Sequence, residues 1–481
     1  MTHQRIGVVM DRLERFSLVS YLVVMTIIGL FFVFKNTPLT GLDERFHFFR
    51  SYQMAQGTML PKLINGEKGA WGGCVERKAL QYVWPFFISQ DQNQPASKED
   101  AIKRAKEIDA SNDTVSTCFN FAPSAAYSPL LYAPSAIGIA ITKYTSFGID
   151  TQMYAGRVMN LVFFIAMVYA AVMMMPIMRI PTLMILSFPT LLNLASSYSP
   201  DPVTNLVTVM FIACCLRMAI LKEKIFWQTF VLACLVGLLK MTNIAFLPFV
   251  LLIPSSLFSS RIKWLAYMAG SIAAGCAVAL AWNGYYSWVP SQFWHSGGDI
   301  KAAKEMLLTQ PFATVIFLIK SVIIQTPDMF DRMFATFGGG PAAYTWTFGG
   351  KYCYLAIFSI FMATLSSVSR SQIAFNKLKL YLLPVMSIGS VLLIFLALWV
   401  GFSPLNIPFV GGVQGRYFII SFMTAMIFIV MMLSRSETFA KSWLGVALID
   451  KPVLAFSTFT YLMIISHVCY LSIVKYWPMY N

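Results

Sequence analysis

The sequence predicts an all-α, polytopic membrane protein. Of its 481 residues, 57% are hydrophobic and only 12% are charged, whereas soluble proteins carry about 25% charged residues. Long apolar runs recur along the chain, and the first, residues 17–34, contains no charged residue. Such a run approaches the roughly 20 apolar residues that a transmembrane helix needs. We therefore expect one integral membrane domain, residues 1–481, organised by the hydrocarbon layer.

The first apolar run has the flanks of an uncleaved helix. Arg5, Arg12 and Arg15 precede it, and Lys-Asn-Thr-Pro follows it from residue 35, with no small-residue cleavage site of the kind that ends a signal peptide. Because basic residues flank the cytoplasmic ends of membrane helices, we expect the N-terminus in the cytoplasm.

The remaining runs predict the number of crossings. Two are short: residues 127–142 contain two prolines, and residues 312–325 contain Lys320. If neither crosses, the basic residues of most short loops face the cytoplasm, as the positive-inside rule requires. We expect about 11 transmembrane helices, two short helices that lie on the outer face or are re-entrant, and an external C-terminus. The runs expected to cross are residues 17–34, 158–177, 181–198, 202–220, 225–240, 242–258, 264–283, 352–368, 380–401, 417–433 and 453–474.

The net charge of +15 does not indicate nucleic-acid binding. The basic residues are scattered over short loops and form no patch, whereas nucleic-acid-binding domains gather them on one face. A basic excess is what the positive-inside rule produces in a polytopic protein. The partner that the composition predicts is therefore membrane lipid, with no nucleic acid.

The topology gives two large outward segments. The first, residues 35–157, is expected to contain short helices beside the membrane, and the second comprises residues 284–351. Cys74 and Cys118 lie in the first segment. Outside the cytoplasm they can form a disulfide; two free thiols are the alternative.

Charged residues crowd the exit of the first helix. Asp43 and Glu44 are either an ordinary polar flank or carboxylates held at the outer interface, where one could act as a general base. His47 and Arg50 follow Asp43 at i+4 and i+7, so the three share one face if the segment is helical. A lone histidine is more often a hydrogen-bonded interface residue than a catalyst.

A second acidic position occurs in a turn between two apolar runs. Asp201 lies between Pro200 and Pro202, and an acidic residue before a proline is typical of a helix start. Helix capping and a role in an active site are both compatible with this position.

Three basic residues end apolar runs on the same outward side. Arg157, Lys240 and Arg416 could extend to lipid headgroups or bind the phosphate of a lipid substrate. Arg416 is the strongest phosphate candidate, because it follows glycines at 411, 412 and 415 and arginine binds phosphate in a bidentate manner.

Five short motifs occur along the chain: DERFHFFRSYQ (residues 43–53), YSPLLYAPS (127–135), RVMN (157–160), SPD (199–201) and QGRY (414–417). In this order they resemble the motifs of a bacterial branch of the GT-C glycosyltransferases. These are multi-spanning enzymes that use sugars linked to polyprenyl phosphate. In length and layout the chain is also similar to phage- and island-encoded O-antigen glucosyltransferases, which bring about serotype conversion.

The resemblance implies a fold and a reaction. The fold would be GT-C-like, in the bacterial inner membrane with the active site facing the periplasm. The donor would be a polyprenyl-phosphate-linked sugar, with glucose as the expected sugar, and the acceptor a lipid-linked or lipopolysaccharide glycan such as the O-antigen. Transfer would invert the anomeric centre. No cofactor is implied with certainty; some members use a divalent metal, which stays open here because the second turn has no paired Asp-x-Asp.

The resemblance also implies roles for particular residues. Asp43, with Glu44 beside it, corresponds to the catalytic base. The expected substrate-binding residues are His47, Arg50, Tyr127, Arg157, Asp201, Lys240, Gln414, Arg416 and Tyr417.

Two other functional classes handle similar lipid-linked glycans. A transporter or flippase usually shows internal repeats and charges at mid-membrane, and here the charges lie at the outer boundary and no repeat is found. An O-antigen polymerase or ligase is the other alternative.

Overall fold

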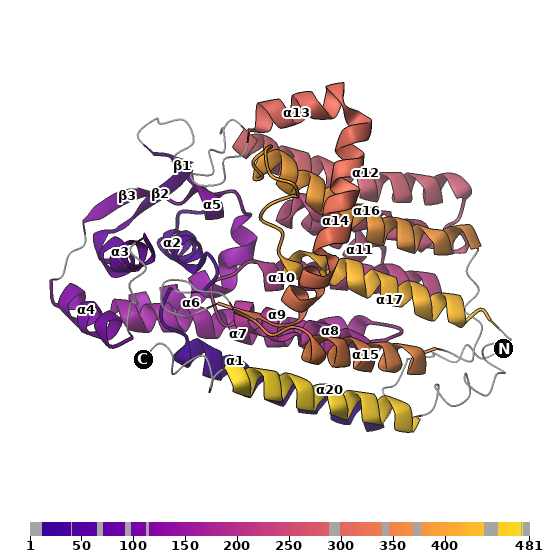
Figure 1. The fold of residues 1–481 in the computed structure, drawn as a ribbon, viewed down its shortest axis with the longest axis horizontal. Helices are drawn as coiled ribbons and strands as arrows, with labels where there is room; N and C mark the ends of the chain where they lie inside the picture. The colour runs from indigo at the N-terminus through magenta and orange to yellow at the C-terminus, as the bar shows by residue number, and fades with distance from the viewer. Residues whose placement is uncertain are drawn as a thin grey trace.

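The computed structural model shows a bundle of long helices that carries a smaller mixed region at one end (Figure 1). It describes residues 12–39, 41–64, 71–91, 98–111, 115–287, 299–338, 346–368, 377–436, 451–472 and 474. We call residues 41–147 the cap, and the end of the bundle that they cover the capped end. The main hydrophobic core lies between the bundle helices, and a second core, with Phe48, Phe121 and Tyr198 among its members, lies under the cap.

Eight helices in the described residues are long and apolar enough to cross a membrane. The expected class, an all-α polytopic membrane protein, is confirmed. The eight belong to α1 (Arg12–Lys35), α7 (Ile149–Met174), α10 (Asp201–Leu216) with η2 (Arg217–Leu221), α12 (Arg261–Ser287), α14 (Pro311–Phe334), α16 (Lys377–Gly401), η6 (Gly415–Phe418) with α17 (Ile419–Leu433), and α20 (Lys451–Leu471).

Eight long helices are fewer than the expected crossings, about 11, and the described residues also contain shorter apolar helices. Three apolar helices of 10–17 residues complete the bundle: α11 (Phe226–Leu239), η3 (Met241–Leu252) and α15 (Lys351–Ser366). The run 181–198, expected to cross as one helix, is instead divided into α8 (Arg179–Leu186) and α9 (Pro189–Ala195). Pro189 lacks the amide hydrogen that would continue the first helix.

Of the two runs expected to form short helices, one does and the other does not. Residues 127–142 form η1 (Pro129–Tyr132) and α6 (Ala133–Tyr144), neither long enough to cross. The run 312–325 lies within the 24-residue helix α14, so its predicted shortness was wrong. The helix continues through Pro327 to Phe334 because the last residues still bury Met329 and Met333.

The cap combines short helices with a three-stranded antiparallel sheet. Cys74 and Cys118 face each other on neighbouring strands and form a disulfide. The cap elements are α2 (Glu44–Ala55), β1 (Lys62–Leu63), β2 (Trp71–Glu76), α3 (Arg77–Asp91), α4 (Lys98–Ala110), β3 (Ser116–Asn120), α5 (Ala122–Ala125), η1 and α6. The remaining elements are η4 (Ser255–Leu257), α13 (Ile300–Thr309) and the paired strands β4 (Thr336–Phe337) and β5 (Trp346–Thr347).

Candidate functional site

A cluster of charged side chains lies at the junction of the cap and the bundle. Asp201, at the start of α10, forms ion pairs with Lys240 (Oδ1 to Nζ, 3.3 Å) and with Arg416 (Oδ2 to Nε, 2.6 Å). Lys240 follows the end of α11, and Arg416 belongs to η6. Pro200 occupies the N-cap position of α10 and Asp201 is the first residue of the helix. The carboxylate of Asp201 is engaged by the two cations.

Tyr417 lies beside both cations of this cluster. Lys240 Nζ is 4.0 Å from the centroid of its ring, and the guanidinium carbon of Arg416 is 5.3 Å from it. The negative face of an aromatic ring attracts a cation at such distances. One carboxylate therefore faces two cations, and the group carries an excess positive charge suited to an anion such as phosphate.

Asp43 presents a free carboxylate beside this cluster. Its backbone is left-handed, with φ of 54°, a conformation that aspartate tolerates better than most residues. The side chain is exposed and does not cap α2, and no hydrogen bond or ion pair engages it in the described part of the chain. Its charge acts on His47, Tyr127 and Arg416.

His47 lies buried between Asp43 and two tyrosines. Its Nδ1 shares a 2.8 Å hydrogen bond with the hydroxyl of Tyr132, and its ring centroid is 5.9 Å from that of Tyr127. Burial lowers the pKa of His47 to about 4, so the imidazole is neutral at neutral pH. Burial also raises the pKa of Tyr127 and Tyr132, which keeps both phenols protonated.

Glu44 and Arg157 form a separate, fully buried pair. The guanidinium donates to both carboxylate oxygens, Nε to Oε1 at 2.7 Å and Nη2 to Oε2 at 2.6 Å. Its other N–H groups donate to the backbone carbonyls of Val33, Asn36 and Thr37. Both side chains are 0% exposed. The expected roles of Glu44 as a base and of Arg157 as a phosphate ligand therefore do not fit this geometry, because neither group is accessible to a substrate.

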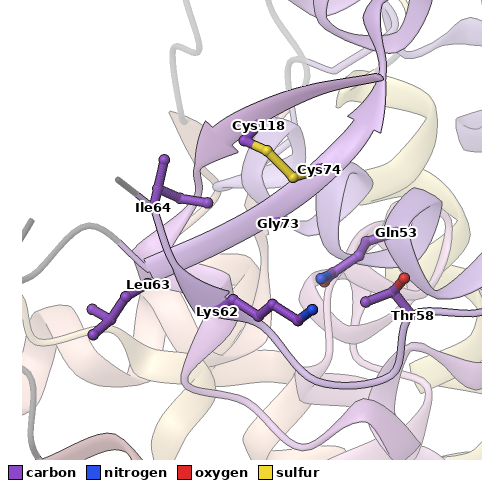
Figure 2. Close-up of a pocket in the computed structure, with 8 residues that line it drawn as sticks. All are labelled: Gln53, Thr58, Lys62, Leu63, Ile64, Gly73, Cys74 and Cys118. Atoms are coloured by element: carbon purple, nitrogen blue, oxygen red, sulfur yellow. A yellow bond between two sulfur atoms is a disulfide. The ribbon is translucent and has the colours of Figure 1, made fainter. Parts of the chain in front are cut away.

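Arg50 forms its hydrogen bonds within the cap. It donates to Gln53 Oε1 and to the carbonyl of Met59, each at 2.6 Å, and it is fully buried. Gln53 lines a pocket of about 170 Å³ beside the Cys74–Cys118 disulfide, as Figure 2 shows. Arg50 thus holds the turn after α2, and its expected contact with substrate does not fit this position.

Gln414 immediately precedes η6. Its side-chain oxygen is buried and accepts no hydrogen bond from any described residue. Buried polar atoms usually have a partner, so this oxygen is an unsatisfied acceptor next to Arg416. Its neighbour Gly415 packs directly against the backbone of α14 at Met329 and Met333.

Among the expected site residues, the structure brings together Asp43, His47, Tyr127, Asp201, Lys240, Arg416 and Tyr417. Sequence reasoning missed Tyr132, the hydrogen-bond partner of His47. The motif at residues 127–135 contains two tyrosines, and only the first was singled out. In the described residues, no group of three or more His, Cys, Asp or Glu side chains could hold a metal ion.

The fold and the cluster define a polytopic membrane protein with a polar site at one end of its helices. Residues 26–423 match the model of a family described as predicted membrane protein (DUF2142). The chain belongs to this family. Comparisons with curated proteins and with solved structures gave no match.

Proposed function

We propose that this protein is an inverting glycosyltransferase of the bacterial inner membrane, with its site facing the periplasm. Its donor is a sugar, glucose in the first instance, carried on polyprenyl phosphate, and its acceptor is a periplasmic glycan such as the lipopolysaccharide O-antigen. One observation carries the proposal: the exposed carboxylate of Asp43, which has no partner among the described residues, lies beside a cluster in which two cations face one carboxylate.

The three candidate carboxylates differ in what they can do. Glu44 is buried and engaged by Arg157. Both oxygens of Asp201 are paired with cations. Asp43 is exposed and free to accept a proton, which makes it the base of the proposed reaction.

The proposed step transfers one glycosyl group. A hydroxyl oxygen of the acceptor attacks the anomeric carbon while Asp43 takes the hydroxyl proton. The bond between the anomeric carbon and the phosphate oxygen breaks, and its electron pair leaves with the phosphate. Arg416 and Lys240 stabilise the negative charge on that leaving group. Attack from the face opposite the phosphate inverts the anomeric centre.

The test compares Asp43→Asn with the parent in membranes supplied with labelled glucosyl polyprenyl phosphate and O-antigen acceptor. Asparagine keeps the left-handed backbone and removes the proton acceptor, so we expect transfer to fall about 100-fold or more. Glu305→Gln, which neutralises an exposed carboxylate on α13, is the matched control and should transfer at the parent rate. Parent-level transfer by Asp43→Asn would exclude Asp43 as the base.

A further inference from the structure

Helix α14 combines the length of a membrane span with the side-chain pattern of a surface helix. Most of its exposed apolar side chains recur on one face, which we call the α14 stripe; Ile324, which is 62% exposed, lies outside it. The opposite face is polar, because the two sets lie about 180° apart at 100° per residue. The stripe consists of Phe312, Val315, Ile316, Ile319 and Ile323, which are 44% to 85% exposed. The polar face consists of Thr314, Ser321, Gln325, Asp328 and Arg332.

The polar face of α14 contacts other residues of the protein in one part and is exposed in another. The hydroxyl of Ser321 accepts from the amide of Val410, and Gln325 donates to the carbonyl of the same residue. Asp328 and Arg332 form an exposed ion pair at 2.7 Å. The stripe, in contrast, is exposed on the other side of the helix. An isolated patch of this kind in water would be an aggregation hazard.

Both halves of α14 meet the capped end of the bundle. In the first half, Phe317 packs on Trp399, in the last turn of α16. The second half lies against Gly415, beside Arg416. The chain that follows the helix continues to Gly338, which lies against Leu42, next to Asp43. A helix of 24 residues is about 36 Å long, so a spanning α14 would reach the opposite end of the bundle.

Figure 1 agrees with these contacts, since the axis of α14 runs across the direction of α17 and α20. We infer that α14 does not cross the bilayer. It lies in the membrane plane, with the stripe among the acyl chains of the leaflet at the capped end and the polar face toward the headgroups and residues 402–416. Interfacial helices bury their apolar face about 5–10 Å below the headgroups in this way.

This placement gives α14 a second role at the charged cluster. The segment 402–416 is hydrogen-bonded to the polar face of α14 through Val410. Near its end, Gly415 packs against the backbone of α14 and leaves no room for a side chain. Arg416 is therefore held at the depth of the helix, near the boundary between headgroups and acyl chains. The inference concerns lipid contact and needs no transferase activity.

The test measures the depth of the stripe. Three variants each carry one added cysteine, in place of Phe312, Ile316 or Ile323. Each variant is labelled with bimane in detergent and reconstituted into phosphatidylcholine vesicles. The vesicles contain lipids with nitroxides at defined acyl positions, which quench bimane at the same depth. We expect one common quenching depth for the three positions. If α14 spanned the bilayer, positions 312 and 323 would differ by about 16 Å. The parent, treated with bimane in the same way, serves as the blank for its own free cysteines.

Helix α1 provides the matched control. Val19 and Phe34 are exposed on it and are separated by about 22 Å along the axis, so their quenching depths should differ widely. A cysteine at Asp328 should be quenched by aqueous iodide. A graded depth along α14 like that along α1, or quenching of the stripe by iodide alone, would overturn the inference. Each of the three stripe positions is an independent reading, so a poorly folded variant leaves the comparison intact.

Discussion

Replacing Glu44 by glutamine should destabilise the protein far more than replacing its neighbour Asp43 by asparagine. Glu44 accepts two hydrogen bonds from Arg157, at 2.7 and 2.6 Å, and both side chains are 0% exposed. Removing one partner of such a pair leaves the other charge buried and uncompensated, at a cost of about 3–5 kcal/mol. Asp43 is exposed and pairs with no residue in the described ranges, and asparagine tolerates its left-handed backbone, so its replacement should change stability by less than about 0.5 kcal/mol.

The assay is unfolding in detergent, followed for the parent, both single variants and the double variant Glu44→Gln/Arg157→Met. The double variant removes the uncompensated charge and should recover part of the loss. Recovery is incomplete because the carbonyls of Val33, Asn36 and Thr37 also lose their donor. Equal stability of Glu44→Gln and the parent, or equal losses from both single variants, would refute the reasoning.

Three further predictions concern other parts of the site and the cap. Arg416→Lys keeps the charge but loses the planar guanidinium beside Asp201, and we expect sugar transfer to fall about 100-fold while binding of unrelated lipid, measured as a control, is unchanged. The pKa of His47 is lowered to about 4 from its usual 6.5, so the unfolded chain binds this proton first as pH falls. Stability should decrease by about 3 kcal/mol between pH 6.5 and 4, and His47→Gln should flatten this dependence in melting experiments; an unchanged slope would contradict it. Reducing the Cys74–Cys118 disulfide, which joins residues 44 apart, should lower the stability of the cap by about 4 kcal/mol; limited proteolysis before and after reduction measures this, with Cys74→Ser as the genetic equivalent.

The helical bundle could be predicted because its signal is local. Each apolar run is long enough to identify a buried or lipid-facing helix, and Asp201 and Lys240 could be placed at the same boundary from the positions of those runs. The division of 181–198 was missed because both halves are equally apolar. The pattern of α14 was underestimated because Pro327 suggested an end that packing overrides.

The sequence could not predict that Asp43 is exposed while Glu44 is buried in an ion pair. The two residues are adjacent, and their difference depends on Arg157, which is 113 residues away from Glu44. No spacing rule connects such positions. The same is true of Tyr132, which is 85 residues from His47. Arg50 differs, because its partners Gln53 and Met59 are only 3 and 9 residues away. Local patterns identified the polar residues near the boundary, whereas long-range packing decided which of them face one another.

The Glu44–Arg157 pair also has a consequence for biogenesis. During synthesis Glu44 emerges 113 residues before its partner, so its carboxylate must stay hydrated until α7 has been made. The carbonyls at the end of α1 also lack their hydrogen-bond donor until the guanidinium of Arg157 has been made. The junction between α1 and α2 can therefore take its final form only when α7 packs against α1. A nascent chain arrested before residue 157 would carry a first helix already inserted and a cap not yet attached to it.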